Sequence, residues 1–132
     1  MTTYLLDANV LIALTIVEHE HHARASVWAA GVERFAVCPI VEGALARFLV
    51  RIGEKPDTAV AILRQVRMRS GFEFWPDSLS YADASLGHVR GHRQVTDAYL
   101  VSLAAERGGV LATMDEALVR VVPQGAVRVP PL

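Results

Sequence analysis

Short apolar runs alternate with longer amphipathic stretches along this chain, and this alternation restricts its fold more than any other feature. Each run has the length of a buried strand, and the stretches between them are long enough for helices. Strands that alternate with helices form parallel sheets, with helices packed on the two faces. The sequence therefore predicts an α/β fold with three α/β/α layers and a central parallel sheet of about five strands. The predicted strands are residues 4–6, 34–38, 72–75, 110–113 and 127–129.

Length and composition are typical of one compact domain. The chain has 132 residues, of which 52% are hydrophobic and 20% are charged, so we expect a single domain over residues 1–132. No apolar run approaches the roughly 20 residues that span a bilayer, and the N-terminus lacks the pattern of a signal peptide. The single cysteine, Cys38, follows an apolar run and is expected in the core. These features favour the cytoplasm and predict no membrane partner.

The basic residues are unusual in kind rather than in number. The net charge is −1, so total charge does not point to nucleic acid. Twelve of the thirteen basic residues are arginines, whose planar donor fork suits phosphate groups, and Lys55 is the only lysine. A group of arginines in mid-chain is also compatible with the solvated faces of helices. Its members are Arg47, Arg51, Arg64, Arg67 and Arg69.

Three local patterns carry further structural predictions. The histidines of Glu18-His19-Glu20-His21-His22 do not have an established zinc-ligand spacing, so this stretch predicts a solvated helix start in which His22 packs locally. Residues 80–89 are predicted to be helical despite Gly87, with Asp83 on the surface. Thr96 is predicted to cap the helix that follows it.

The first apolar run ends in an aspartate. Asp7 follows Tyr4-Leu5-Leu6, and the apolar pattern resumes at Val10. Asp7 therefore lies where a strand ends and a helix begins, and in open α/β sheets ligands bind outside this end of the strands. Aspartate and asparagine are also good helix caps, so Asp7 or Asn9 could serve only as a cap.

Three further acids are predicted at the same edge of the sheet. Glu42 falls in the first turn of the helix that Pro39 begins, and Asp97 falls in the first turn after Thr96. Asp115 directly follows the strand at residues 110–113. Carboxylates gathered in this way repel one another unless their pKa values rise or a cation neutralises them. Oxygen ligands suit Mg²⁺ or Mn²⁺, and a bound metal can activate water for phosphodiester hydrolysis.

Taken in order, these segments resemble the four acidic motifs of PIN-domain nucleases. The matching residues are Leu5-Leu6-Asp7-Ala8-Asn9, Glu42, Val95-Thr96-Asp97-Ala98 and Thr113-Met114-Asp115. They extend over nearly the whole chain, as in the VapC toxins of bacterial VapBC toxin–antitoxin systems. The resemblance implies a toxin that is an endoribonuclease dependent on Mg²⁺ or Mn²⁺. It also implies an RNA substrate, a VapB-type antitoxin, and a homodimer or a toxin–antitoxin hetero-oligomer.

The resemblance also implies a role for each residue. Asp7 and Asp97 would be the principal metal ligands, while Glu42 and Asp115 would complete the acidic pocket, directly or through water, and position the attacking water. Asn9 and Thr113 would orient Asp7 and Asp115 by hydrogen bonds. Whether Glu116, beside the fourth motif, joins the site stays open.

Other classes of protein fit the sequence less well. A phosphoaspartyl enzyme would need a lysine late in the chain, and the only lysine is Lys55. A dinucleotide-binding domain would need a glycine-rich turn after the first strand, where this chain has Asp7-Ala8-Asn9-Val10. The remaining alternative is a catalytically silent PIN-fold module that acts by binding RNA or antitoxin. Loss of an acid would favour that alternative, and all four acids are present.

Overall fold

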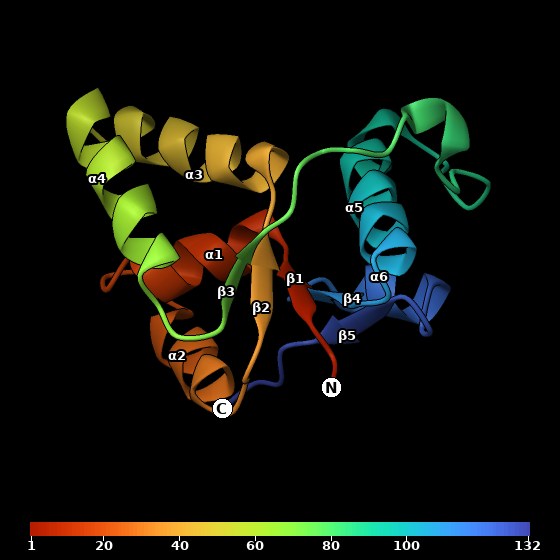
Figure 1. The fold of residues 1–132 in the computed structure, drawn as a ribbon, viewed down its shortest axis with the longest axis horizontal. Coiled ribbons are helices and arrows are strands. Elements are labelled where there is room, and N and C mark those ends of the chain that lie inside the picture. Colours follow the sequence, from red (N-terminus) through yellow and green to blue (C-terminus); the bar gives the residue numbers. More distant parts are fainter.

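A computed structural model describes all residues from 1 to 132 as a five-stranded sheet with helices on both sides (Figure 1). The strands are β1 (Tyr4–Leu6), β2 (Phe35–Val37), β3 (Phe72–Phe74), β4 (Val110–Thr113) and β5 (Ala126–Arg128). The α-helices are α1 (Ala8–Thr15), α2 (His22–Ala30), α3 (Pro39–Arg51), α4 (Pro56–Arg67), α5 (Val95–Glu106) and α6 (Glu116–Val121). Two short 3₁₀ helices, η1 (Tyr81–Asp83) and η2 (His92–Gln94), precede α5.

The sheet has the order β3-β2-β1-β4-β5, which puts β1 in the middle. All four strand pairings are parallel, and Leu5 of β1 is opposite Ala36 of β2 and Leu111 of β4. The carboxyl ends of all five strands therefore share one edge. Both the number of strands and the parallel arrangement confirm the prediction from sequence.

Helices α1 to α4 lie on one side of the sheet, and α5 and α6 lie on the other (Figure 1). The order of the strands explains this arrangement. From β1 the chain adds β2 and β3 toward one edge of the sheet, and it then adds β4 and β5 toward the other edge. Crossovers between parallel strands are right-handed, so reversing the direction of advance puts the connecting helices on the opposite face. The result is the predicted three-layer α/β/α architecture.

Burial in the core explains the continuous apolar stretches of the sequence. Residues 10–14 of α1 are all buried, because this helix packs against β4 and against helices α2 and α3. Cys38 is fully buried at the end of β2, and burial raises the pKa of its thiol to about 12. It therefore stays protonated as a core residue. None of the helices has both the length and the apolar character that a membrane crossing requires.

The histidine-rich stretch forms local contacts, as predicted for His22. The helix α2 begins at His22, whose Nδ1 lies 2.8 Å from the carbonyl oxygen of Ala13. The Nδ1 of His19 accepts a hydrogen bond from the backbone N–H of His21 at 3.0 Å. These contacts explain why the stretch forms the corner between α1 and α2.

Two predictions before α5 are wrong. Residues 80–89 form only the single turn η1, because Ala84 has an extended backbone and none of these residues is fully buried, so packing does not stabilise a longer helix. Thr96 is not the cap of α5, which begins at Val95 with Gln94 at the capping position. The reason is that η2 runs directly into α5, so the chain enters the helix one residue earlier than the capping pattern predicts.

Candidate active site

Asp7 lies at the carboxyl end of β1 and is buried, with 6% of its surface exposed. Its backbone N–H donates to the carbonyl oxygen of Ala112 in β4 at 2.9 Å, which fixes its position at the sheet edge. Its Oδ1 accepts the backbone N–H of Ala8 at 2.7 Å, so Asp7 caps α1. Its Oδ2 accepts the hydroxyl of Thr113 at 2.7 Å. Asp7 is thus both a helix cap and a side chain of the site.

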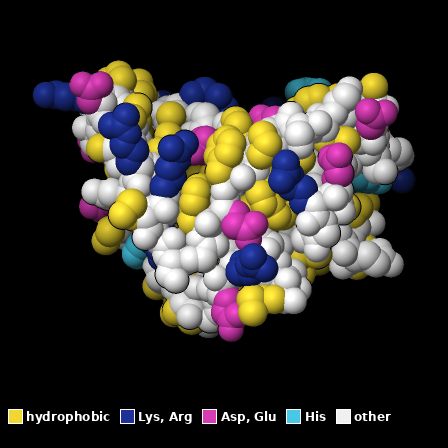
Figure 2. Space-filling view, in the orientation of Figure 1, with side chains coloured by type: hydrophobic (Ala, Val, Ile, Leu, Met, Phe, Trp, Pro, Cys, Tyr) yellow, Lys and Arg dark blue, Asp and Glu magenta, His cyan; other side chains and the backbone are white.

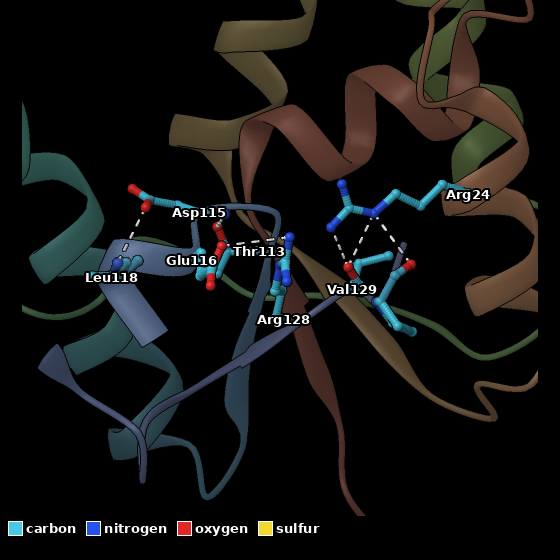
Figure 3. A network of polar contacts seen from close by, with 8 residues as sticks. Arg24, Thr113, Asp115, Glu116, Leu118, Arg128 and Val129 are labelled. Atoms are coloured by element: carbon cyan, nitrogen blue, oxygen red, sulfur yellow. Dashed lines mark hydrogen bonds and ion pairs between the residues drawn. The ribbon is translucent and has the colours of Figure 1, made fainter. Parts of the chain in front are cut away.

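Thr113 connects two of the predicted acids. Besides donating to Asp7, its hydroxyl accepts the backbone N–H of Asp115 at 3.0 Å. Asp115 in turn caps α6, since its Oδ1 accepts the backbone N–H of Leu118 at 3.1 Å. In Figure 3 the Asp115 carboxylate turns toward Leu118, whereas Glu116 lies on the other side, facing Arg128. The ends of β1 and β4 are therefore joined by side-chain hydrogen bonds as well as by backbone pairing.

Asp97 approaches the same place from the opposite layer. It is half-buried in the first turn of α5. Burial raises the pKa of Asp97 to about 6, and repulsion by Asp7 and then by Asp115 adds to the rise. Burial also raises the pKa of Asp7, the hydrogen bonds from Thr113 and Ala8 oppose that rise, and repulsion by Asp115 adds to it. The three carboxylates therefore interact directly through their charges.

One hollow of about 230 Å³ contains all three aspartates. Besides the aspartates its polar lining consists of Asn9, Thr96 and Arg47. A larger hollow of about 650 Å³ lies elsewhere, under α2, and most of its lining is apolar. We assign the site to the smaller hollow, hereafter the acidic pocket, because its lining includes three aspartates, and the pKa values of two of them, Asp7 and Asp97, are raised. Its full lining is Asp7, Ala8, Asn9, Ile40, Val41, Ala44, Arg47, Thr96, Asp97, Leu100 and Asp115.

Of two other predicted residues, Asn9 lines the pocket and Glu42 does not. Asn9 is exposed and lines the pocket, but its side chain forms no hydrogen bond with Asp7 or Asp115. Glu42 is half-buried in the first turn of α3 and does not line the pocket. Helix geometry explains this position, since Glu42 points about 160° away from Ala44, two residues later, which does line it.

Glu116 faces away from the acidic pocket. It is exposed, and its Oε2 lies 3.7 Å from a guanidinium nitrogen of Arg128. It does not line the pocket that Asp115 lines. The question that the sequence left open is therefore decided by the direction of the side chain, which turns toward β5.

Sequence reasoning missed three residues near the acids. Arg47 and Thr96 line the acidic pocket. His88 lines a small adjoining hollow of about 80 Å³ together with Asp97 and Asp115, and its Nε2 is buried without a hydrogen-bond partner. Arg47 stood within the arginine group, but no local pattern separates it from its neighbours. His88 lies in an irregular loop, within the segment that the sequence pattern wrongly predicted to be helical.

The donor set of the pocket fits a hard divalent cation. The three aspartates offer oxygen ligands, and none of them forms an ion pair with a basic side chain. No three acidic, histidine or cysteine side chains converge closely enough to hold an ion as they stand. Mg²⁺ is commonly bound by one or two carboxylates and several waters, so it does not need three converging side chains. A cation would also relieve the repulsion that raises the pKa values of Asp7 and Asp97.

Comparison with known proteins identifies the family of this chain. The PIN domain family matches residues 4–122. The chain is 48% identical over 129 residues to ribonuclease VapC29 of Mycobacterium tuberculosis, covering 97% of both chains. It is 38% identical over 137 residues to ribonuclease VapC39 of the same organism, covering 96% of this chain and 99% of the relative.

Solved structures share the fold at low sequence identity. The sarcin–ricin loop cleaving toxin VapC20 of Mycobacterium tuberculosis has a TM-score of 0.69 and 17% identity, over 90% of this chain and 95% of that chain. A toxin–antitoxin complex from Klebsiella pneumoniae has a TM-score of 0.68 and 18% identity, over 98% and 99% of the two chains. The match over residues 4–122 includes every predicted acid from Asp7 to Asp115. This chain therefore belongs to the PIN-domain family, and its sequence groups it with the VapC ribonucleases.

Proposed function

We propose that this protein is the toxin of a type II toxin–antitoxin system and cleaves RNA internally, with Mg²⁺ or Mn²⁺ as cofactor. The observation that carries the proposal is the acidic pocket, whose lining includes an aspartate after β1, one in the first turn of α5 and one after β4. The 48% identity to a VapC ribonuclease over nearly the whole chain supports the same activity. RNA hydrolysis needs a site that activates water and tolerates a phosphate, and a cation among carboxylates supplies both.

Asp7 and Asp97 are the proposed metal ligands. Asp7 is held by hydrogen bonds from Ala8 and Thr113, so its carboxylate keeps one orientation. Asp97 faces it across the pocket from α5. When bound, the ion would lower the pKa of a water molecule and reduce the negative charge on the phosphoryl oxygens.

Asp115 and Glu42 are proposed to position the attacking water. The Oδ1 of Asp115 accepts the N–H of Leu118, which fixes the carboxylate while it lines the pocket. Glu42 has neither a hydrogen bond nor an ion pair from its side chain, and its chain neighbour Val41 lines the pocket, so we propose that it acts through water. Thr113 remains a proposed supporting residue through its bonds to Asp7 and Asp115, whereas Asn9 forms no such bond and would support the site only from its position in the pocket lining.

We further propose that a VapB-type antitoxin holds the protein inactive, in a homodimer or a toxin–antitoxin hetero-oligomer. The related Klebsiella pneumoniae structure is a toxin–antitoxin complex, which supports this class of partner. An antitoxin segment that covers apolar surface and inserts an arginine among the aspartates would neutralise the acidic pocket. Co-purification with the product of the neighbouring gene tests this partner, and a toxin that never forms a stable complex would contradict it.

A cleavage assay with purified protein tests the enzymatic proposal. We expect cleavage of RNA with Mg²⁺ or Mn²⁺ and none with a chelator. Asp97→Asn should fold and lose activity, whereas Asp83→Asn should keep it, because Asp83 is an exposed aspartate outside the acidic pocket. Cleavage that persists in Asp97→Asn would show that the site is elsewhere. A wild-type protein that binds RNA or antitoxin but never cleaves would favour the silent PIN-fold module.

A further inference from the structure

The acidic pocket continues into a second hollow of about 500 Å³. The two share four lining residues, Ala8, Asn9, Ala44 and Arg47, which come from α1 and α3. The remaining lining of the second hollow is Ile12, His19, Phe48 and Arg51. We call this second hollow the α1–α3 groove. An extended ligand that occupied both hollows would pass from the aspartates along the start of α1 and across α3.

The α1–α3 groove has the opposite charge to the pocket that it joins. Its lining includes no acid, and its charged residues are Arg47 and Arg51. Both arginines are exposed, and neither lies in an ion pair. Figure 2 shows several arginine or lysine side chains on the part of the surface that α3 and α4 occupy. An unpaired guanidinium next to three carboxylates is suited to a polyanion whose reacting phosphate reaches the acids.

A glycine leaves room for the Arg47 guanidinium. A Cβ at Gly43 would lie 3.3 Å from Nη1 of Arg47, so the guanidinium folds back over this glycine toward the start of α3. The backbone of Gly43 does not have a positive φ, so its conformation does not require glycine. Glycine inside a helix is unfavourable relative to alanine. The close approach of Arg47 gives a physical reason for glycine at this position.

The far part of the groove has an aromatic surface. The Arg51 guanidinium lies over the ring of Phe48, 5.6 Å from its centroid, and both residues line the groove. Unpaired bases stack on aromatic rings and on guanidinium planes, and such stacking tolerates many sequences. Bases of a duplex are already stacked on one another, so this surface favours a single strand.

We propose that the α1–α3 groove binds the single-stranded part of the RNA substrate. Arg47 contacts the phosphate next to the one that is cleaved, and a base stacks on the Phe48–Arg51 pair. This inference rests on the proposed ribonuclease function. It adds the surface along which the bound RNA strand extends from the acidic pocket. Arg47 and Arg51 are binding residues here, because the attacking water is positioned by the carboxylates.

Binding without cleavage tests the groove separately from the nuclease activity. The probe is a fluorescently labelled single-stranded RNA of about twelve nucleotides, followed by anisotropy with the full chain in EDTA. We expect Arg47→Gln and Arg51→Gln each to weaken binding several-fold. Arg47→Gln should also reduce the slope of log affinity against log salt concentration by about 0.7, since its phosphate contact is lost. Arg64→Gln is the matched control, because it removes the same charge from an exposed arginine on α4.

Two further variants separate the effects of base stacking and of the Arg47 side-chain position on binding from the effect of charge. Phe48→Leu should weaken binding about tenfold without changing the salt slope, because it removes a ring and no charge. Gly43→Ala should weaken binding less than Arg47→Gln while leaving the protein at least as stable, because the Arg47 side chain must shift. A duplex of the same sequence should bind more weakly than the single strand.

The possible outcomes distinguish the groove proposal from the ribonuclease proposal. If Arg47→Gln and Arg64→Gln weaken binding equally, the arginines act only through total charge and the groove is not a binding site. If all groove variants bind like the wild type while metal-dependent cleavage continues, the groove proposal is wrong and the ribonuclease proposal stands. If the wild type binds through the groove but never cleaves, the groove proposal stands and the ribonuclease proposal is wrong.

Discussion

The hydroxyl of Thr113 donates a hydrogen bond to Asp7 at 2.7 Å across 106 residues of sequence. The same oxygen accepts the backbone N–H of Asp115 at 3.0 Å. One buried side chain therefore holds the acids at the ends of two neighbouring strands. This arrangement makes Thr113 the most direct test of whether the site depends on fixed carboxylate positions.

Replacing Thr113 with valine should lower activity while keeping the fold. The isosteric change removes the donor to Asp7, so one bond that opposes the rise in the pKa of Asp7 is lost. The acidic limb of the pH profile of kcat/KM should therefore move to higher pH, and the unsatisfied carboxylate should destabilise the protein by about 1–3 kcal/mol. Thr113→Ser keeps the hydroxyl and should restore the wild-type pH profile. An unchanged profile for Thr113→Val would show that this bond does not control Asp7.

Replacing Asp97 with asparagine should stabilise the metal-free protein above pH 6. Burial and two neighbouring aspartates raise the pKa of Asp97 from 3.8 to about 6, so the folded state holds this proton more tightly than the unfolded state. The free energy of unfolding of the wild type should therefore fall as pH rises from about 4 to 6. Asparagine carries no charge, so the variant should lack this fall and be about 1–2 kcal/mol more stable at pH 7.5. Urea unfolding in EDTA at several pH values measures the difference, and a less stable variant at pH 7.5 would contradict it.

Mg²⁺ should raise the melting temperature of the wild type more at pH 7.5 than at pH 5. At the higher pH the Asp97 carboxyl, whose pKa is about 6, is ionised and can bind the ion. A ligand that binds only the folded state at 100 times its Kd adds about 2.7 kcal/mol to the free energy of unfolding. Thermal melts with Mg²⁺ and then EDTA measure the shift, with Asp97→Asn as the control that should show little of it. Equal shifts for both proteins would place the ion elsewhere.

Glu42→Gln should reduce cleavage less than Asp97→Asn. Glu42 lies in the first turn of α3 and does not line the acidic pocket, so a role through water predicts a partial loss and a higher Mg²⁺ requirement. Titrating Mg²⁺ in the cleavage assay separates these two effects. Complete loss at every Mg²⁺ concentration would indicate that Glu42 binds the ion directly, after a movement of the start of α3.

Local sequence patterns predicted most of the elements. The starts of α3 and α4 follow from prolines at the first helical position, and the strands follow from short apolar runs. The same reasoning failed for residues 80–89, where the pattern allowed a helix but the segment packs too few apolar side chains to hold one. Packing therefore decided the secondary structure of the segment before α5.

Sequence also predicted which acids would share an edge. Asp7 and Asp115 follow strands that pair in parallel, and Asp97 lies in the first turn of the helix that precedes β4. These positions follow from chain order, because parallel strands bring their carboxyl ends together. Glu42 was predicted by the same rule, yet the direction of a side chain from a helix depends on how the helix is rotated against its neighbours.

By itself the sequence determined the parallel α/β architecture and the three aspartates at its carboxyl edge, because both depend on short-range patterns and chain order. Only the tertiary structure decided that Thr113 joins Asp7 to Asp115, that Arg47 folds over Gly43 and lines the acidic pocket, and that Glu116 turns away. The physical reason is that these relationships depend on side-chain directions and on contacts between distant segments, and the packing of helices on the sheet sets both.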